Sequence, residues 1–354
     1  MTSMFRSCGD NETLTRRALL GTGIALTAAA CSGISTQPAA PFGSVRRLSP
    51  ELDALIAQDA VIEQIAGGLQ WAEGPVWSRS GDYLLFSDPP KNTMYRWSSA
   101  RGAKAFLKPS GYAGADNGQL REPGSNGLAF DAKGALLICD SGNRALVRLD
   151  LATRRREILA DHFEGRRFNS PNDLCVARSG AIYFTDPPYG LTGIEKSPVK
   201  ELPFSGVYRY GADGNVILLD KSFLYPNGVV LSPDERTLYV SNTDSKQPII
   251  RAYHLDADGL PTGISTFFDT TPLIAPGVRG MPDGIKADAA GNLFAAGPGG
   301  ILVLTPQAKL LGVISVSGRT IPNCAFGEDG MTLFLAATDT VARIRLKTHG
   351  KDWM

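Results

Sequence analysis

The sequence predicts an all-β protein, a six-bladed β-propeller with four-stranded blades. Two observations lead to this prediction. A polar residue at the head of an apolar strand recurs six times, at intervals of roughly 40 to 55 residues, which is the period of propeller blades. After most copies follows an apolar run that ends in Asp or Asn, as in LLFSD at Asp88 and IYFTD at Asp186. The six polar positions are Glu73, Asn126, Asn172, Asn227, Asp283 and Asn323.

Each repeat contains four short apolar segments separated by turns, which is the content of one propeller blade. In the third repeat the segments are 173–176, 181–185, 207–210 and 216–219, with Gly and Asp between them. A blade has two apolar faces, and stacking around a ring buries both. The segment Val61 to Leu69 precedes the first repeat, and we expect it to supply the outer strand of the last blade. An open solenoid or a sandwich is the alternative.

The first thirty residues predict a twin-arginine export signal and not part of the fold. Arg16-Arg17 precede an apolar stretch of thirteen residues, 18–30, which is shorter than the ~20 residues that span a bilayer. The Ala-rich end at 28–30 is either a cleavage site or a degenerate lipoprotein box in which Cys31 carries a lipid. An uncleaved N-terminus is the alternative. The expected location is the periplasm, either free or as a membrane-anchored lipoprotein.

The rest of the chain is predicted to contain a flexible tether at 31–48 and a single propeller domain at 49–354. The tether is rich in Ser, Pro, Ala and Gly. At its end Ser49-Pro50 opens a short helix that we expect to run to about Gln58, with Ser as cap and Pro in the first turn.

Composition argues against several classes of function. The net charge is +1 with mixed signs, and no second apolar segment reaches membrane length, so we expect neither a nucleic-acid partner nor a transmembrane span. Cys139, Cys175 and Cys324 are odd in number without CxxC spacing, which argues against a disulfide framework. The three histidines all lie outside the motif positions. A histidine-rich zinc site therefore has no obvious ligands, and a Ser-His-Asp triad has no obvious base.

The motif residues are candidates for a metal site, because a propeller brings equivalent positions of every blade to one axis. All six are hard oxygen donors, which suit Ca²⁺ with its roughly 6 to 8 oxygen ligands. Glu73 and Asp283 would balance the charge of one divalent cation. Each motif alone could be an ordinary turn, since Asn-Gly and Asp-Gly are common turn pairs. The recurring Asp88, Asp140 and Asp186 are expected to be structural, holding turns between strands.

With these residues identified, the chain resembles the senescence-marker-protein/gluconolactonase family of six-bladed propellers. The resemblance runs from about Leu69 to Leu346 and rests on WAEGPVW, NSPNDL, DPPYG, PNGVVLSPDE and PDGIKAD. It implies one catalytic divalent metal ion, usually Ca²⁺, and in some members Zn²⁺, Mn²⁺ or Mg²⁺. The implied ligands are Glu73, Asn172, Asn227 and Asp283, with Asp283 also the candidate general base.

The resemblance also implies contacts to the substrate. Asn126 is expected near the substrate or its attacking water. Ser170 stands where animal members carry a substrate-binding Arg, which leaves the sugar acid undefined. The insert Ser110–Gly124 separates the first two repeats and is either a lid, with Arg121 contacting hydroxyl groups, or a surface loop. Asn323 is expected to be structural.

The predicted function is therefore metal-dependent hydrolysis of a sugar-derived lactone. Water would attack the ester carbonyl that the metal polarises, with either Asp283 or a hydroxide on the metal starting the reaction. Two alternatives stay open. One is a metal-dependent phosphotriester hydrolase, and the other is a non-catalytic propeller in which a metal only joins the blades and the rim binds a partner.

Overall fold

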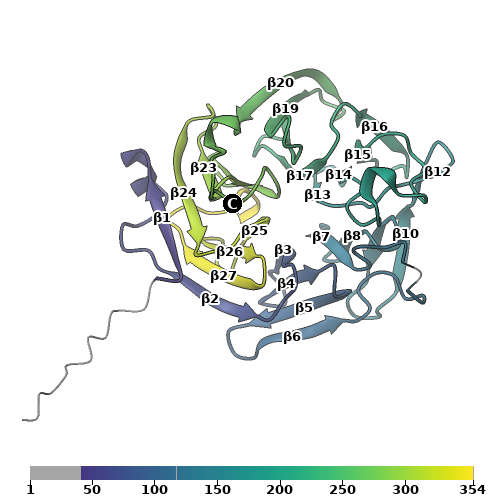
Figure 1. The fold of residues 1–354 in the computed structure, drawn as a ribbon, viewed down its shortest axis with the longest axis horizontal. Helices are drawn as coiled ribbons and strands as arrows, with labels where there is room; N and C mark the ends of the chain where they lie inside the picture. Colours follow the sequence, from purple (N-terminus) through teal and green to yellow (C-terminus); the bar gives the residue numbers. More distant parts are fainter. Residues whose placement is uncertain (1–40, 117, 354) are drawn as a thin grey trace, which may run out of the picture. The chain divides into compact units, whose positions relative to one another are not determined.

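Six β-sheets follow one another around a central axis (Figure 1). The structure is a computed structural model that describes residues 41–116 and 118–353. From Pro41 onward these residues form one compact unit. The strands of every blade are antiparallel, and β3, β7, β13, β17, β21 and β25 lie nearest the axis, so the predicted all-β six-bladed propeller is confirmed.

The first three blades follow the chain order without interruption. Blade 1 consists of β3 (Glu73–Ser78), β4 (Tyr83–Asp88), β5 (Thr93–Ser98) and β6 (Gly102–Leu107). Blade 2 consists of β7 (Ser125–Phe130), β8 (Leu136–Asp140), β9 (Ala145–Leu149) and β10 (Arg156–Ala160). A small hairpin of β11 (His162–Phe163) and β12 (Arg166–Arg167) leads to blade 3, which consists of β13 (Leu174–Val176), β14 (Ile182–Asp186), β15 (Gly206–Tyr210) and β16 (Val216–Asp220).

The other three blades complete the ring, two of them with strands from the N-terminal side. Blade 4 consists of β17 (Pro226–Leu231), β18 (Thr237–Asn242), β19 (Ile249–Leu255) and β20 (Pro261–Asp269). Blade 5 consists of β21 (Ile285–Ala287), β22 (Leu293–Gly297), β23 (Gly300–Leu304), β24 (Leu310–Val316) and β1 (Gly43–Arg47). Blade 6 consists of β25 (Asn323–Gly327), β26 (Thr332–Ala337), β27 (Thr340–Arg345) and β2 (Ile62–Gly67). Short 3-10 helices lie at η1 (Pro50–Ala54), η2 (Ile194–Lys196), η3 (Thr271–Leu273) and η4 (Lys351–Trp353).

The ring closes through β2, which lies along β27 in Figure 1. The pairing is antiparallel, with Ile62 opposite Ile344 and Gly67 opposite Thr340. The prediction that Val61 to Leu69 supplies the outer strand of the last blade is therefore confirmed. Because blade 6 combines β2 from the N-terminal side with β27, the last strand, the two ends of the propeller cannot separate without breaking the hydrogen bonds between these strands.

The N-terminal side differs from the prediction in two ways. Residues 43–47 form β1, which pairs with β24 and makes blade 5 five-stranded, so the tether does not extend to residue 48. The side chain of Val45 packs against the core of blades 5 and 6, which gives this segment a reason to be ordered. The predicted export signal, Cys31 and the start of the tether lie outside the described residues.

The predicted short helix is a single 3-10 turn, and within the described residues there is no α-helix. It ends at Ala54 and does not reach Gln58. The guanidinium group of Arg47 binds the carbonyl oxygens of Ile56 and Ala57, at 3.2 and 2.6 Å, and so uses carbonyl groups that further helical turns would need.

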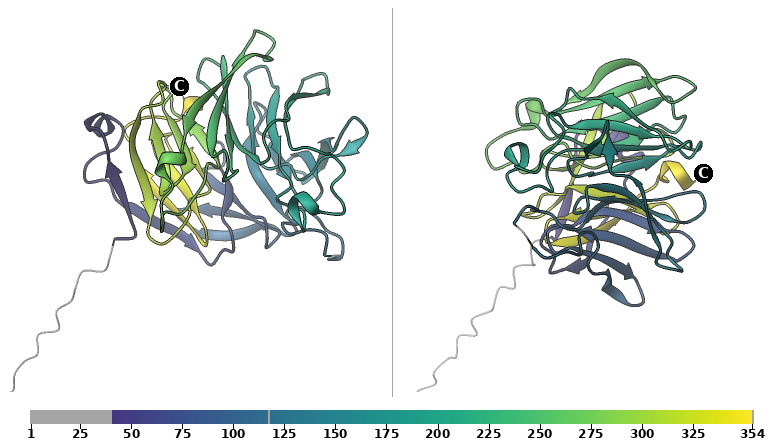
Figure 2. Two further views of the ribbon diagram at one scale, coloured as in Figure 1. Left: turned by 45° about the horizontal axis from the view of Figure 1, so that its top comes forward. Right: turned by 90° about the vertical axis from the view of Figure 1, so that its right-hand side faces the viewer.

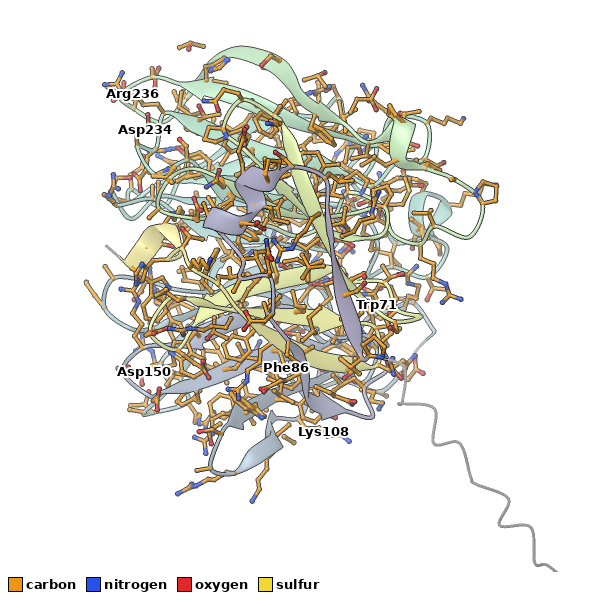
Figure 3. All side chains as sticks on the ribbon, turned by 90° about the vertical axis from the view of Figure 1, so that its left-hand side faces the viewer. Trp71, Phe86, Lys108, Asp150, Asp234 and Arg236 are labelled. Atoms are coloured by element: carbon orange, nitrogen blue, oxygen red, sulfur yellow. The ribbon has the colours of Figure 1, made fainter. Side chains whose placement is uncertain are left out.

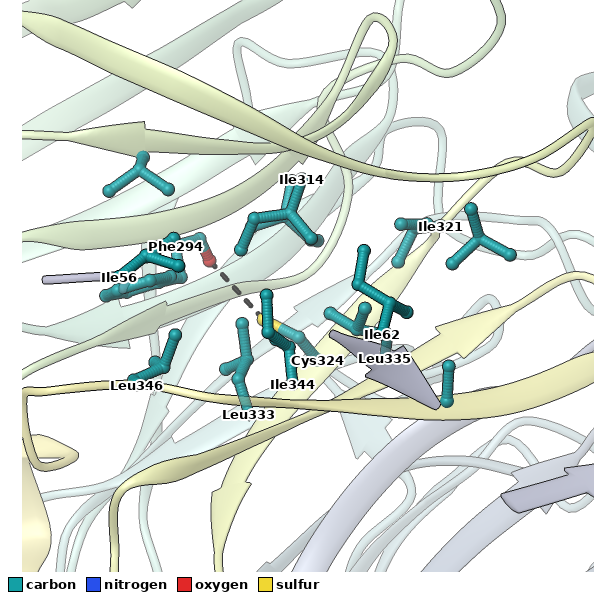
Figure 4. Packing of buried hydrophobic residues seen from close by; sticks show 14 of the residues in the cluster. Ile56, Ile62, Phe294, Ile314, Ile321, Cys324, Leu333, Leu335, Ile344 and Leu346 are labelled. Atoms are coloured by element: carbon teal, nitrogen blue, oxygen red, sulfur yellow. Dashed lines mark hydrogen bonds between the residues drawn. The ribbon is translucent and has the colours of Figure 1, made fainter. Parts of the chain in front are cut away.

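The apolar core is divided into clusters between neighbouring blades. Figure 4 shows the cluster between blades 5 and 6, which includes Ile62 of β2 and Ile56 just after η1. At its centre the Cys324 thiol donates to the carbonyl oxygen of Phe294, 3.5 Å away. Cys324 and Cys139 are both fully buried and act as small core residues.

The two faces of the propeller carry different connections. In the side view of Figure 3, Trp71 and Lys108 lie on one face, and Asp150, Asp234 and Arg236 lie on the other. Trp71 precedes the start of β3, so the innermost strands begin on the Trp71 face. The two further views in Figure 2 show the blades standing around the axis, with the C-terminal segment at one face. None of the helices in the described part of the chain is long and apolar enough to cross a membrane.

Candidate active site

The six motif residues gather at the axial ends of the innermost strands, on the Trp71 face. Glu73 opens β3 and Asn323 opens β25, while Asn126 and Asn227 are the second residues of β7 and β17. Asn172 and Asp283 lie just before β13 and β21. All are buried except Asp283, which is partly buried. Figure 1 shows these strands around the centre of the ring.

Hydroxyl groups hold three of the motif residues to the preceding blade. Ser87 donates to the main-chain oxygen of Asn126 over 2.8 Å. Thr185 donates to that of Asn227 over 2.6 Å, and Ser241 to that of Asp283 over 2.7 Å. The three hydroxyls occupy the same place in the sequence, directly before the Asp or Asn that ends the second strand of their blade. The axial geometry is therefore fixed between blades, through the backbone.

The glycines that follow the motif residues are required by this close packing. A Cβ atom on Gly74, whose φ is +49°, would lie 1.9 Å from the main-chain oxygen of Asn126. One on Gly228 would lie 2.2 Å from that of Asp283. Glycine is present because neighbouring blades touch there, and not only because these pairs form turns.

The recurring aspartates at strand ends are structural, as predicted. The Asp88 carboxylate accepts the backbone N–H groups of Gln70 and Trp71, at 2.9 and 3.2 Å. Asp186 likewise accepts those of Asn169 and Ser170, at 2.7 and 2.8 Å. Each carboxylate therefore fixes the segment that leads into a motif residue of its own blade.

Hydrogen bonds orient the axial amides differently. The Asn227 amide nitrogen donates to the Thr243 hydroxyl over 3.0 Å, which leaves its side-chain oxygen free of that contact. Asn126 Oδ1 is buried and accepts no hydrogen bond from any residue that the structure describes, and the same holds for Asp283 Oδ1. Buried polar atoms are almost always paired, so two unpaired oxygens in one ring suit a cation ligand.

Asn323 differs from the other amides because both of its polar atoms are engaged. Its nitrogen donates to Glu73 Oε2 over 3.3 Å, and its oxygen accepts the backbone N–H of Cys324 over 2.9 Å. These bonds agree with the structural role expected for Asn323.

The carboxylates share one buried environment. Burial raises the pKa of Glu73 from 4.5 to about 7, and the charge of Asp173 adds to this, against the hydrogen bonds from Gly74 and Asn323. Burial also raises the pKa of Asp283 well above its ordinary value, and the charges of Glu73 and Asp173 raise it further. Without a cation, ionisation of these carboxyl groups therefore costs free energy.

The buried pair of Asp173 and Lys286 was not identified from the sequence. Lys286 Nζ lies 3.6 Å from Asp173 Oδ2 and 3.4 Å from Asn323 Oδ1. Burial lowers the pKa of Lys286, but Asp173 and further negative neighbours outweigh this, so its pKa lies above the ordinary value. Asp173 takes the place of the glycine that follows most motif residues, and this departure from the repeat was the available signal.

Ser170 also holds the loop 187–190. Its hydroxyl is buried, donates to the Pro187 carbonyl over 2.6 Å and accepts the Gly190 N–H over 2.8 Å. A contact of Ser170 with substrate stays a prediction.

Arg121 lies beside the site, at the tip of the insert. Its side chain is half exposed and forms an ion pair with Glu122. The backbone N–H groups of Arg121 and Glu122 both reach the carbonyl oxygen of Gly190, at 2.8 and 3.2 Å. The described residues of the insert are thus docked on blade 3, in contrast to a free surface loop.

Glu122 and Tyr189 complete this side of the site, and the sequence did not identify them. Glu122 is buried, and its charge raises the pKa of both Glu73 and Asp283. Tyr189 hydrogen-bonds Thr243 and lies within electrostatic reach of Asp283. Neither residue recurs in other repeats, so the repeat pattern could not indicate them.

The polar groups described next do not belong to the axial site. A surface cavity of about 770 Å³ opens between blades 3 and 4 and is lined by Tyr183, Arg209 and Asp234, among others. Figure 3 places Asp234 on the face opposite Trp71, so this cavity is separate from the axial site. Among the residues that the structure describes, no group of three or more His, Cys, Asp or Glu side chains is arranged to hold a metal ion. The axial set differs from such groups because amides form much of it.

The fold and the site define a class of protein, the six-bladed β-propellers whose polar residues from successive innermost strands meet at one end of the axis. Comparison with known sequences gives the family. Residues 71–339 match the SMP-30/Gluconolactonase/LRE-like region, and the chain belongs to this family.

Individual relatives agree with the family. The chain is 45% identical to a gluconolactonase of Zymomonas mobilis over 334 residues, which cover 92% of each chain. It resembles the solved structure of a gluconolactonase from Xanthomonas campestris, with 31% identity and a TM-score of 0.73 over 88% of this chain and 99% of that one. It shares its fold with regucalcin from Agrobacterium tumefaciens, described as a calcium-binding protein, at 22% identity and a TM-score of 0.63 over 80% and 95% of the two chains.

Proposed function

We propose that this protein is a gluconolactonase, a hydrolase that opens the ester bond of a sugar-derived lactone. The observation that carries the proposal is the 45% identity with the Zymomonas mobilis gluconolactonase across 92% of both chains. The ring of carboxylates and amides, buried except for the partly buried Asp283, supplies the polar groups that such a reaction needs, with one residue from each of the six blades.

The reaction is proposed to depend on one divalent cation, with Ca²⁺ the first candidate. Glu73, Asn172, Asn227 and Asp283 would hold it. Two features support the fit. Asp283 Oδ1 accepts no hydrogen bond from the described residues, and the pKa values of Glu73 and Asp283 are raised by burial and by neighbouring negative charge, which a cation would offset. Oxygen donors of this kind are the ligands that Ca²⁺ prefers. A bound divalent cation supplies a Lewis acid beside the substrate.

The protein's own residues then have separate tasks. Asp283 is the proposed general base, which removes a proton from the attacking water and returns it to the ring oxygen as the C–O bond breaks. Asn126, with its unpaired buried oxygen, is proposed to orient that water or the substrate. The hydroxyls of Ser87 and Ser241 fix the backbone of these two residues, which limits how far either can move.

The test is hydrolysis of glucono-δ-lactone by the mature protein, with spontaneous opening subtracted. We expect activity that disappears after chelation and returns with Ca²⁺. Restoration with Zn²⁺, Mn²⁺ and Mg²⁺ in parallel identifies the preferred ion. Metal analysis must show that the divalent ions have been removed completely. Activity that persists in such a sample would contradict the metal-dependent mechanism.

The two alternative functions are tested in the same assay. A phosphotriester substrate measured beside the lactone separates a phosphotriester hydrolase from a lactonase. A protein that binds calcium but hydrolyses neither compound would be a propeller in which the metal only joins the blades. The unpaired oxygen of Asn126 favours the enzyme, because Asn126 is not one of the proposed ligands and a purely structural cation needs no further polar group beside them.

We further propose that the chain is exported by the segment with Arg16 and Arg17, into the periplasm. Lipid attachment at Cys31 is the second possibility for the same segment. Replacing both arginines by Lys and following the protein by cell fractionation tests the export, since the protein should then stay in the cytoplasm. Mass spectrometry of the mature N-terminus distinguishes cleavage from lipidation of Cys31.

A further inference from the structure

The insert Ser110–Gly124 is anchored at both ends by blade 1. Asn92 Oδ1 accepts the backbone N–H groups of Ser110 and Gly111, at 3.0 and 2.8 Å. The N–H of Gly124 reaches the carbonyl oxygen of Pro89, and within the insert the N–H of Tyr112 reaches that of Pro123. These bonds make the base of the insert a defined part of the site wall.

The tip of the insert is joined to the loop that carries Tyr189. Leu120 and Leu191 form an isolated β-bridge, and the Thr192 N–H donates to the carbonyl oxygen of Gln119 over 2.9 Å. Together with the two bonds from Arg121 and Glu122 to Gly190, these contacts connect blades 1 and 3 across blade 2. The side chains of Glu122 and Tyr189 are therefore held in a fixed relation to each other.

Tyr189 is oriented on three sides. Its ring stacks on that of Tyr225, with centroids 5.4 Å apart and planes 19° from parallel. The Arg121 guanidinium carbon lies 6.0 Å from its centroid, and its hydroxyl bonds Thr243. Thr243 also accepts from the Asn227 amide and donates to the Pro282 carbonyl over 2.7 Å. The Tyr189 ring thus stands directly beside the proposed cation ligands.

Glu122 brings a fourth carboxylate to the same space. Only 7% of its surface is exposed, although it lies in an insert, and its ion-pair partner Arg121 reaches toward solvent. The buried carboxylates of Asp88 and Asp186 accept backbone N–H groups, whereas the side chain of Glu122 has only Arg121, on its Oε1, as a partner among the described residues. The hydroxyl groups of a bound sugar would supply further hydrogen bonds, since a carboxylate only accepts them and a sugar hydroxyl donates them.

We infer that Glu122, Arg121 and Tyr189 form a subsite that recognises the ring hydroxyl groups of a polyhydroxylated lactone. Glu122 accepts hydrogen bonds from these hydroxyls and Arg121 donates to their oxygens, while Tyr189, stacked on Tyr225, holds the Arg121 guanidinium in position. This inference rests on the proposed lactonase function and adds the substrate class that the site selects.

The consequence is discrimination by hydroxyl groups. A site built to hydrogen-bond a substrate hydroxyl rejects an analogue that lacks it, because its buried polar groups are left unpaired. Glucono-δ-lactone should therefore be strongly preferred over δ-valerolactone, which has the same six-membered ester ring without hydroxyls.

The experiment compares kcat/KM on these two lactones for the full chain with metal present. The Glu122→Gln variant should lose about 10- to 100-fold on glucono-δ-lactone, because a charged acceptor is replaced by a neutral one. The loss on δ-valerolactone should be smaller by that factor, because any effect of the Glu122 charge on Glu73 and Asp283 is common to both lactones. Tyr189→Leu should act in the same direction through a higher KM. Glu157→Gln, on the exposed outer strand β10, is the matched control and should leave both values unchanged.

Several results would overturn the subsite. An equal loss of kcat/KM on both lactones would assign Glu122 to the reaction or the fold. Unchanged kcat/KM values on both would show that other residues bind the hydroxyl groups. A calcium titration in which Glu122→Gln loses affinity would make Glu122 a metal ligand. If the unmodified protein hydrolyses neither lactone, the proposed function itself fails, and this result is distinct from activity with unaltered preference in the variants.

Discussion

The side-chain amide nitrogen of Asn227 lies 3.0 Å from the hydroxyl oxygen of Thr243, to which it donates a hydrogen bond. An asparagine amide can turn over, and this bond decides which end faces the axis. With its nitrogen held by Thr243, Asn227 presents its oxygen as a potential ligand. Thr243 follows β18 of the same blade, so blade 4 supplies both the ligand and the group that orients it.

Removal of this orienting bond should weaken metal binding. In Thr243→Val a methyl group replaces the acceptor hydroxyl, and we expect calcium affinity to fall about 10-fold or more, as is typical when a partner of a metal ligand is lost. Asn227→Ala, which removes the ligand itself, should cost more. Isothermal titration with calcium measures both. Thr266→Val on the exposed strand β20 serves as control, and an unchanged affinity in Thr243→Val would contradict the role of this bond.

Asp283→Asn should retain the fold and lose turnover. The change keeps the shape of the side chain but removes the proposed base, so we expect kcat to fall at least about 10²-fold. Thermal melts should match those of the unmodified protein or exceed them, because the buried negative charge is gone. Asp258→Asn, in an exposed turn of blade 4, controls for general effects of the substitution. Full activity in Asp283→Asn would remove Asp283 from the mechanism.

Much of this arrangement could be predicted from the sequence because a propeller converts a repeat into a ring. Residues as distant in the chain as Glu73 and Asn323 share one position in their repeats, and their side chains are in contact where blade 6 meets blade 1. The closing strand could also be predicted, since six blades need one more outer strand than the last repeat supplies.

The residues that the sequence did not indicate are those that occur once. Glu122 lies in an insert without a counterpart in other blades, and its burial depends on the docking of that insert on Gly190. The sequence did not indicate strand β1, because the segment is short and largely polar. It is ordered because it pairs with β24 at the edge of blade 5.

The pH dependence of stability follows from the raised pKa of Glu73. In the metal-free protein this pKa is about 7, against 4.5 in the unfolded chain, where the carboxyl is exposed. The folded state therefore holds the proton more tightly, and this contribution is present below about pH 4.5 and is lost as pH rises through about 7. Burial raises the pKa of Asp186 to about 7 as well, which acts in the same direction.

We therefore expect the melting temperature of the metal-free protein to fall by a few degrees, in order of magnitude, between about pH 5 and pH 8. Scanning calorimetry in chelator at several pH values measures this slope. Glu73→Gln should reduce it without abolishing it, because Asp186 remains. Saturating calcium should oppose the loss, since the metal binds the deprotonated carboxylates. A flat profile for the metal-free protein would show that Glu73 titrates normally.

The contact between blades 4 and 5 gives a prediction about the stability of the propeller. A methyl group on Gly228 would lie 2.2 Å from the main-chain oxygen of Asp283, an atom held by Ser241 and unable to move alone. We expect Gly228→Ala to destabilise the protein by about 1–3 kcal/mol, as overpacked sites do, and to lower calcium affinity because Asp283 is displaced. Gly263→Ala is the matched control, since its new methyl group would meet only His254 at 3.6 Å. Equal stability of the two variants in denaturant titration would mean that the blades can separate slightly at the axis, and the close approach would then not explain the glycine.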